Sequence, residues 1–504
     1  MCHWRRTLRL SLLLLGSIDM SASVLLVLAV IIPLLGSALV AVLGRHASLQ
    51  KVVSILAGIF SFSCVLLLTQ AVSQGDRPSI DLFIIAAGLN VSFSAEPLGI
   101  VFALVASFLW IVTTIYAIGY MKTHGGEGRT SFYAYFAIAI AAAMGVAFSA
   151  NLLTLFIFYE VLTLSTYPLV THSGTPEARK AGRIYLGMLL STSIGLFLVA
   201  IVCVWGISGT LEFQTQGILA GKASPLLTGV LCGLFAFGVG KAALMPLHIW
   251  LPQAMVAPTP VSALLHAVAV VKAGVFTILK IMIYVFGIDH LHETGVSLWL
   301  AYLAGITIIL GSLIAMRQDN LKARLAYSTV SQLSYILLGA FIVTTWSTVG
   351  AGMHIVMHAF GKITLFFCAG AILVVSQKTK VSEMAGLGRQ MPVTMICFMV
   401  GALSVIGLPP LGGMWSKWYL ALGTIEAEAY ILLIVLMLSS LLTIVYLLPI
   451  PLRAFFCGAS APSKERHEAP LPCLIAMVVT AVGSVLLFFF PQHLYDLLIQ
   501  LIKP

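Results

Sequence analysis

The sequence predicts an all-α membrane protein of about 14 transmembrane helices. Hydrophobic residues make up 60% of the 504-residue chain and charged residues only 9%, whereas a soluble domain carries about 25% charged residues. Apolar runs of around 20 residues recur along the whole length, and each can cross roughly 30 Å of hydrocarbon. These runs lack the alternation of barrel strands, so helices are the expected spanning elements.

The chain is expected to form one membrane domain, because it contains no polar linker of the kind that separates soluble domains. The expected spans are 24–43, 52–73, 97–121, 132–150, 151–171, 184–207, 226–246, 257–287, 296–316, 323–344, 347–376, 393–423, 429–451 and 471–491.

Basic residues alternate between the loops and so predict an orientation. Numbered from the first span, the odd loops hold sixteen Lys and Arg, while the even loops and the C-terminal tail hold three, with nine acidic residues. Cytoplasmic loops carry the excess of Lys and Arg. We therefore expect the odd loops to lie in the cytoplasm and both termini to lie outside. The expected location is the inner (plasma) membrane of the cell.

Residues 1–20 carry Arg5, Arg6 and Arg9 before an apolar stretch, LSLLLLGS. This pattern is typical of a signal peptide. A start codon assigned too early, with Met20 as the true beginning, explains it equally well. Neither interpretation bears on transport.

Several function classes are disfavoured by the composition. The eight cysteines are scattered singly without a CxxC pair, which disfavours iron–sulfur and zinc sites. GVGK around Lys241 lacks the earlier glycine and the following Ser or Thr of a P-loop. The net charge of +10 is explained by topology and contact with anionic lipids rather than by nucleic-acid binding. No cofactor or metal is expected, and the chain is not expected to be an enzyme by itself.

A few ionisable residues remain inside the predicted spans once the loops and termini are set aside. An ionisable side chain at the bilayer centre costs roughly 2.5–3.5 kcal/mol on insertion scales, so such residues persist mainly where they face a protein interior and move ions or protons. The remaining residues are Glu160, Lys241, Lys272, Lys280, Lys362 and Lys417.

Glu160 is the one carboxylate among them. It lies in the middle of NLLTLFIFYEVLTLSTYPLV. We expect it to pair with Lys241, because opposite charges keep each other ionised, and opening of the pair would let either group release a proton. The alternative is a purely structural ion pair between two helices.

Lys272 lies in the middle of the eighth span, six residues after His266. A buried lysine can exchange protons where an arginine cannot. His266 could instead be a satisfied core histidine. Lys280 lies nearer the outer end of the span, where its side chain could extend to the membrane surface, and we leave it out of the predicted proton relay. That relay is the set of buried side chains expected to pass protons: Glu160, Lys241, His266, Lys272, His354, His358, Lys362 and Lys417.

His354, His358 and Lys362 follow one another at intervals of four residues, which places them along one face of a helix. Such a protonatable stripe suits transfer of protons through intervening water. A metal site at the HxxxH pair is disfavoured, because no glutamate or third ligand lies nearby.

Two spans are expected to be interrupted by proline. Lys241 precedes Pro246 and Pro252, and Lys417 follows GLPPLGGMWS; proline removes a backbone donor and breaks a helix. The broken helices are five spans apart and so run in opposite directions, which indicates inverted repeats. The expected organisation is helices 1–3 in 21–131, repeat one (helices 4–8) in 132–287, repeat two (helices 9–13) in 296–451 and helix 14 in 471–504.

These motifs resemble the proton-conducting antiporter-like subunits of Mrp cation/proton antiporters, complex I and membrane-bound hydrogenases. The resemblance covers roughly residues 90–425. The segments that carry it are FYEVLTLSTYPLV, GKAALMPLHIWLPQAMVAPTPVSALLHAVAVVKAG, NLKARLAYSTVSQLSY, HIVMHAFGKITLFFCAGAI and GLPPLGGMWSKWYL.

The resemblance implies fourteen helices and a hydrated axis through a glutamate on the fifth helix and lysines on the seventh, eighth and twelfth. Those positions correspond to Glu160, Lys241, Lys272 and Lys417. The family member that has a long lateral helix after its last spans is not expected, because this chain ends soon after its last span. A lysine at 417 disfavours the complex I subunit that carries an acid at this position. The chain most resembles the D-type component of the Mrp antiporters.

Two functions follow from the resemblance. The first is a proton-translocating subunit of a multisubunit monovalent cation/proton antiporter, with Na⁺ or K⁺ as the second ion and other membrane subunits as partners. The alternative is a proton-pumping membrane subunit of an NADH-quinone oxidoreductase-like or hydrogenase complex, whose redox sites lie on other chains. A scaffold with vestigial lysines is disfavoured, because every expected relay position is present.

Overall fold

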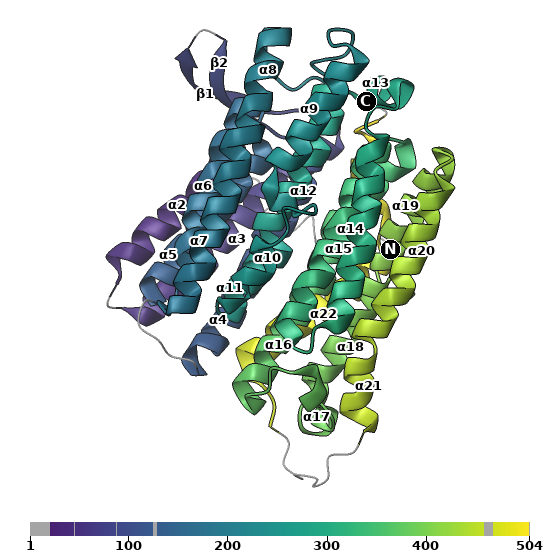
Figure 1. The fold of residues 1–504 in the computed structure, drawn as a ribbon. Coiled ribbons are helices and arrows are strands. Elements are labelled where there is room, and N and C mark those ends of the chain that lie inside the picture. The colour runs from purple at the N-terminus through teal and green to yellow at the C-terminus, as the bar shows by residue number, and fades with distance from the viewer. Residues whose placement is uncertain (1–20, 45, 87, 124–128, 458–466, 503–504) are drawn as a thin grey trace, which may run out of the picture.

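The computed structural model describes residues 21–44, 46–86, 88–123, 129–457 and 467–502. These residues form a bundle of long helices with one small β-hairpin at one end (Figure 1). The leader predicted in residues 1–20 lies outside the described residues. The loop that follows the eleventh span and contains α17 lies at the end of the bundle opposite the hairpin (Figure 1).

The first half of the bundle contains eight of the expected spans. Its elements are α2 (Ala22–Val42), α3 (Ala47–Ser73), β1 (Ser79–Ala86), β2 (Leu89–Ser94), α4 (Pro97–Thr123), α5 (Arg129–Phe148), α6 (Leu152–Val170), α7 (Pro176–Thr192), η1 (Ser193–Phe197), α8 (Leu198–Ser208), α9 (Pro225–Gly238), η2 (Gly240–Ala242), α10 (Trp250–Gln253), η3 (Ala254–Val256), α11 (Thr259–Ala263), η4 (Leu264–Val268), α12 (Val270–Ile281), η5 (Met282–Phe286) and α13 (Ile288–Thr294).

The second half contains the other six spans. Its elements are α14 (Leu298–Arg317), α15 (Leu321–Ile342), α16 (Thr345–Ser376), η6 (Val381–Glu383), α17 (Leu387–Gln390), α18 (Pro392–Ile406), α19 (Gly413–Glu426), α20 (Tyr430–Leu447), α21 (Pro449–Phe456), α22 (Leu471–Phe489) and α23 (Gln492–Ile499).

The span count agrees with the sequence prediction. Within the described ranges, 12 helical segments are long and apolar enough to cross a membrane. The shorter apolar helices α9 and α18 belong to the two interrupted spans, which completes the expected set. The all-α membrane fold class is therefore confirmed.

Both interruptions occur where the prolines predict them. The seventh span stops at Gly238 and resumes at Trp250, and the twelfth stops at Ile406 and resumes at Gly413. Each break leaves carbonyl and amide groups without helical partners. These groups are available to bind side chains or water inside the bundle.

Two kinds of local structure were not predicted: π-helical turns and a β-hairpin. Segments η1, η4 and η5 are π-helical turns inside the sixth and eighth spans, and such turns occur frequently at functional sites. Strands β1 and β2 pair antiparallel in the loop between α3 and α4. The hairpin contacts the start of the first span, because Ser23 Oγ donates to the Ser79 carbonyl at 3.1 Å.

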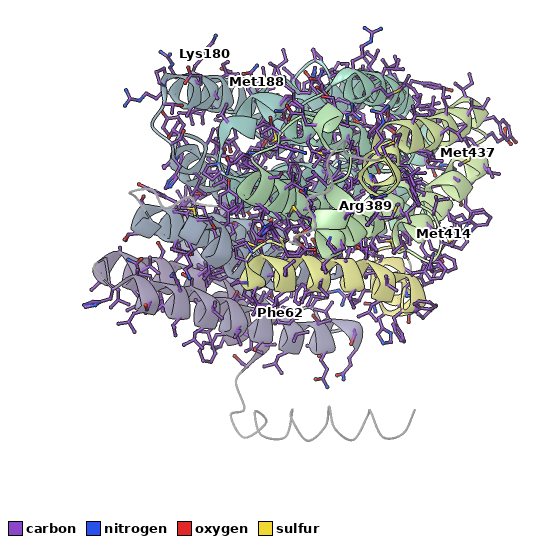
Figure 2. All side chains as sticks on the ribbon, turned by 90° about the horizontal axis from the view of Figure 1, so that it is seen from below. Phe62, Lys180, Met188, Arg389, Met414 and Met437 are labelled. Atoms are coloured by element: carbon purple, nitrogen blue, oxygen red, sulfur yellow. The ribbon has the colours of Figure 1, made fainter. Side chains whose placement is uncertain are left out.

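The eighth and tenth spans form the centre of the bundle. An 18-residue window of Thr259–Phe286 is 100% buried and one of Leu321–Ile342 is 94% buried, against 33% for Tyr430–Phe456 and for Leu471–Phe489. Figure 2 views the bundle from below and shows Phe62 of α3, Lys180 of α7 and Met437 of α20 near its periphery. Predicted relay residues on the central helices are thus removed from lipid.

Candidate functional site: buried ionisable side chains along the bundle

Lys241 lies in the break of the seventh span, on the short turn η2, and its side chain is fully buried. Its Nζ donates to the Tyr159 carbonyl at 2.9 Å and to Thr163 Oγ1 at 2.5 Å. The ammonium position also lies 3.1 Å from the centroid of the Tyr159 ring. The partners of Lys241 therefore come from α6, the helix that carries Glu160.

The expected ion pair between Glu160 and Lys241 is not formed. Both Glu160 carboxylate oxygens are buried without a hydrogen-bond partner, while the Lys241 ammonium is occupied by Tyr159 and Thr163. The two residues still interact electrostatically. The reason is local geometry: the Lys241 ammonium bonds Thr163 Oγ1 and the buried Tyr159 carbonyl instead of Glu160, so the structure holds the pair open.

Glycines let the broken span approach its neighbours closely. A Cβ at Gly274 would overlap the backbone of Lys241 and Ala242, and one at Gly240 would overlap Thr192 Oγ1. Trp250 Nε1 donates to the Gly240 carbonyl at 3.0 Å and so satisfies one group freed by the break. Lys241 is held by backbone contacts with α12 as well as by hydrogen bonds.

Lys272 and His358 are brought together across the two halves of the bundle. Lys272 Nζ lies 2.8 Å from His358 Nδ1, and both side chains are buried. The residues are 86 positions apart in the chain. One proton can be shared directly between these two nitrogens, because each can act as donor or acceptor in its neutral form.

His354 continues this line along α16. Its ring stacks on the His358 ring at 5.7 Å between centroids and on the Tyr335 ring at 5.5 Å. His354 Nδ1 lies 2.8 Å from Ser416 Oγ, the residue before Lys417. Nε2 of each histidine is buried without a partner.

Lys417 lies at the second break. Its Nζ donates to the carbonyl of Ile406, the last residue of α18, at 2.9 Å and to Ser440 Oγ at 3.2 Å. It also lies 4.8 Å from the centroid of the Tyr335 ring. A cation at the carbonyl end of a helix is favoured by the helix dipole. The predicted link between a broken helix and a buried lysine is realised here.

Lys362, the third member of the predicted stripe, has partners on α15. Its Nζ donates to Ser328 Oγ at 2.7 Å and to the Leu325 carbonyl at 3.1 Å. Ser328 also accepts a bond from the Tyr446 hydroxyl at 3.0 Å. Lys362 therefore forms a branch beside the line through Lys272, His358 and His354.

His266 lies on the π-helical turn η4, with its ring 5.0 Å from that of Phe366. Both of its ring nitrogens are buried without a hydrogen-bond partner, as are both polar atoms of Gln332. Buried polar groups in native proteins are almost always paired with protein or ordered water. These atoms, with those of Glu160 and the two histidines, mark where water is needed inside the bundle.

The interpretation of Lys280 as a residue that extends to the membrane surface is wrong. Its side chain is 1% exposed and forms an ion pair with Glu96 at 2.6 Å. Its Nζ also donates to the Ser149 carbonyl at 2.7 Å. The position of a residue along its helix does not determine its exposure, because Glu96 before α4 and Ser149 after α5 cover the Lys280 ammonium.

The sequence also did not single out the groups that position the lysines. These groups are hydroxyls and backbone carbonyls, which carry no charge signal, and those that bond Lys241 and Lys362 lie 34 to 82 residues away in the chain. Tyr159 and Thr163 do lie next to Glu160, and that proximity was the available signal. No group of three or more His, Cys, Asp or Glu that could hold a metal gathers in the described part of the chain.

Residues 149–443 match the family model described as "NADH:quinone oxidoreductase/Mrp antiporter, TM". The chain belongs to this family. The match spans more than half of the chain and includes Glu160, Lys241, Lys272 and Lys417. The chain is thus an antiporter-like, multi-pass membrane subunit.

Relatives with curated names agree with this membership. The chain is 32% identical over 432 residues to NADH-quinone oxidoreductase subunit N of Desulforudis audaxviator, with 82% of this chain and 85% of the relative covered. It is 32% identical over 349 residues to NAD(P)H-quinone oxidoreductase subunit 5 of Zygnema circumcarinatum, with 65% of this chain and 48% of the relative covered. The chain thus spans about half the length of the Zygnema protein.

Two solved structures have the same fold. A chain of the Mrp complex from Dietzia sp. DQ12-45-1b superposes with a TM-score of 0.85 at 21% identity and covers 96% of this chain and 97% of that one. A chain of the archaeal membrane-bound sulfane sulfur reductase gives 0.83 at 23% identity, with 94% and 96% covered. At these identities the likeness establishes the fold.

Proposed function

We propose that this chain is the proton-translocating subunit of a multisubunit monovalent cation/proton antiporter. Protons would move between the two broken helices through Lys241, Lys272, His358, His354 and Lys417. The observation that carries the proposal is the Lys272–His358 contact at 2.8 Å, which joins two predicted relay residues from opposite halves of the chain.

The chemistry of transfer needs only groups of this chain and water. A proton on Lys272 can pass to His358 Nδ1 through their direct contact, while Nε2 of His358 and of His354 are free to exchange with water. His354 reaches the second break through Ser416. Hydrogen-bonded neighbours of this kind support proton transfer at lysine and histidine.

Glu160 sets the charge at the first break. With its carboxylate unpaired, a positive charge on Lys241 is favoured by electrostatic attraction. Rotation of Lys241 from Thr163 toward Glu160 would close the pair and lower the drive for Lys241 to pass its proton on. We propose that opening and closing of this pair times transfer toward Lys272, whose helix contacts the break at Gly274.

The second candidate function is a membrane subunit of a redox-driven complex. It is favoured by the names of the curated relatives, NADH-quinone oxidoreductase subunit N and subunit 5. The Mrp assignment is favoured by the lysine at 417, because the resemblance places an acid at that position in one complex I subunit. Vesicles that hold the assembled complex distinguish the two, because an antiporter responds to a Na⁺ or K⁺ gradient and a redox complex to quinone substrate.

Lys241→Ala, Glu160→Ala and Lys241→Arg test the relay. Each variant should assemble and lose nearly all proton transport in vesicles, because a methyl carries no proton and a guanidinium stays protonated at working pH. The matched control is Lys222→Arg, the same change at an exposed lysine. Near-normal transport in Lys241→Ala or Glu160→Ala would defeat the assignment.

We also propose that the odd loops face the cytoplasm and that helices 4–8 and 9–13 form inverted repeats. Charge distribution and the opposite directions of the two broken spans support these assignments. A thiol reagent that cannot cross the membrane should label a cysteine introduced at Lys180 only from the cytoplasmic side.

A further inference from the structure

A second group of charged residues, of which Lys280 and Glu96 are buried, lies at the hairpin end of the first half, apart from the proposed relay. It surrounds a pocket of about 350 Å³. The pocket walls come from the segment before β1, the end of β2, the start of the loop after α5, the loop before α9 and the eighth span. The lining residues that matter for its chemistry are Arg77, Glu96, Ser149, Glu212, Lys280 and Tyr284.

Lys280 and Glu96 close the inner end of this pocket. The distance between Lys280 Nζ and Glu96 Oε1 is 2.6 Å. In the described part of the chain, this is the only ion pair between a Lys or Arg and a carboxylate. Lys280 Nζ also donates to the Ser149 carbonyl and lies 4.9 Å from the Phe213 ring centroid. The ammonium is held by three different elements, yet it borders a space large enough for several water molecules.

Other titratable and charged groups face the pair from the elements around it. Arg77 supplies a fixed positive charge and Tyr284 a phenol from the same span as Lys280. Glu212 accepts a hydrogen bond from Asn151 Nδ2 at 3.0 Å, and burial raises the pKa of its carboxyl. The pocket therefore has a second carboxyl group that takes up protons more readily than an exposed one.

One buried polar side chain lies between the pocket and the relay along α12. Lys272 and Lys280 lie on the same helix, α12, about 12 Å apart along its axis. Thr277 lies between them, fully buried, and its hydroxyl has no hydrogen-bond partner. A threonine hydroxyl in a helix usually bonds a carbonyl of the preceding turn or another polar group, so this orphan indicates a water position between the two lysines.

We infer that the Lys280–Glu96 pair is a proton port, through which the relay exchanges protons with the hairpin side of the membrane. The inference rests on the proposed proton-translocating function and adds a route along α12. In the outward step, the N–H bond of the Lys280 ammonium breaks and its proton passes to water in the pocket. The neutral amine then takes a proton from Lys272 through water held at Thr277, and the inward step is the reverse.

Lys280→Arg tests the port in the assembled complex reconstituted into vesicles. Arginine keeps the positive charge and can keep the ion pair with Glu96, but it does not release its proton at working pH. We expect proton transport to fall at least about tenfold. Lys222→Arg makes the same change at an exposed lysine on the hairpin side and should transport at the wild-type rate.

The outcome for Lys241→Ala separates the port from the relay itself. If Lys241→Ala abolishes transport and Lys280→Arg transports within about twofold of wild type, the port is overturned and the proposed function stands. If both variants transport normally, both proposals are overturned. Loss of transport in both variants, with Lys222→Arg unaffected, supports the port.

A second pair of variants decides the matter if Lys280→Arg fails to assemble. Thr277→Val keeps the shape of the side chain but removes the hydroxyl, and it should slow transport several-fold. Thr277→Ser keeps the hydroxyl and should transport nearly as fast as wild type. Equal rates in the valine and serine variants would overturn the route along α12.

Discussion

Replacing Gly274 with alanine would add one methyl group where α12 packs against the break that carries Lys241. That methyl would overlap the backbone nitrogen of Ala242 and the carbonyl carbon of Lys241, and it would lie 2.8 Å from the Lys241 carbonyl oxygen. Non-bonded carbon atoms prefer about 3.5–4.0 Å. Because the obstacles are backbone atoms that cannot rotate away, the break must move by roughly 1 Å or more to bring the tightest of these contacts into that range.

The energetic cost follows from this displacement. Overpacking of a buried site costs about 1–3 kcal/mol, and the better helix propensity of alanine returns at most ~1 kcal/mol. We expect a net loss of about 1–2 kcal/mol in the free energy of unfolding, a factor of about 5–30 in the folded-to-unfolded ratio. Because the same shift moves Lys241 relative to α6, proton transport should fall by roughly 10- to 100-fold, as for other misplacements near 1 Å.

Two assays check this prediction. Unfolding of the purified complex in mixed detergent micelles measures stability, and proton flux into vesicles measures function. The matched control is Gly206→Ala on α8, where an added Cβ meets nothing within 4 Å; it should leave transport unchanged and not reduce stability. If Gly274→Ala unfolded and transported like wild type, the close contact between α12 and the break would be refuted.

Two further predictions concern the second half. Ser416→Ala removes the hydrogen-bond partner of His354 Nδ1. This loss should lower the free energy of unfolding by about 0.5–1.5 kcal/mol and slow proton transport into vesicles several-fold. Unchanged transport would exclude Ser416 from the path. Asp319 accepts bonds from Ser382 Oγ at 2.8 Å and from the Ser382 amide at 3.0 Å, and these bonds hold the pKa of Asp319 below its usual 3.8. A carboxyl group whose pKa is lower in the folded than in the unfolded protein stabilises the fold at pH values above the unfolded-state pKa. This stabilisation is lost as the pH falls through the folded-state pKa. Ser382→Ala should therefore lower the thermal midpoint at pH 7, with a difference that shrinks below about pH 3.8; a difference independent of pH would contradict the assignment.

Much of the fold was predictable because the bilayer imposes simple rules on sequence. Long apolar runs predicted the spans, and paired prolines at 246 and 252 and at 409 and 410 predicted both breaks. The hairpin of β1 and β2 is not predicted, because hydropathy and loop charge identify spans and their orientation but not a short strand pair within a loop. The π-helical turns leave no such signal, since they depend on packing within the bundle.

The candidate site was predictable as a set of residues but not as a set of contacts. Glu160 and Lys241 were expected to bond directly because they are opposite charges in one dry region, yet Tyr159 and Thr163 take the ammonium. The position of Lys280 near a span end predicts a side chain that reaches the membrane surface, yet Lys280 forms a buried ion pair with Glu96. Partners of this kind are 78 to 184 residues away or carry no charge, so local pattern cannot identify them.

The sequence by itself determined that this chain crosses a membrane many times and keeps a few ionisable side chains inside. It did so because hydrocarbon tolerates only long apolar helices and penalises each buried charge. Only the tertiary structure decided which nitrogen meets which oxygen or ring: Lys272 with His358, Lys417 with the open end of α18, and Lys280 with Glu96. Those choices depend on distances of a few ångströms between helices far apart in the chain, which close packing sets and hydropathy does not encode.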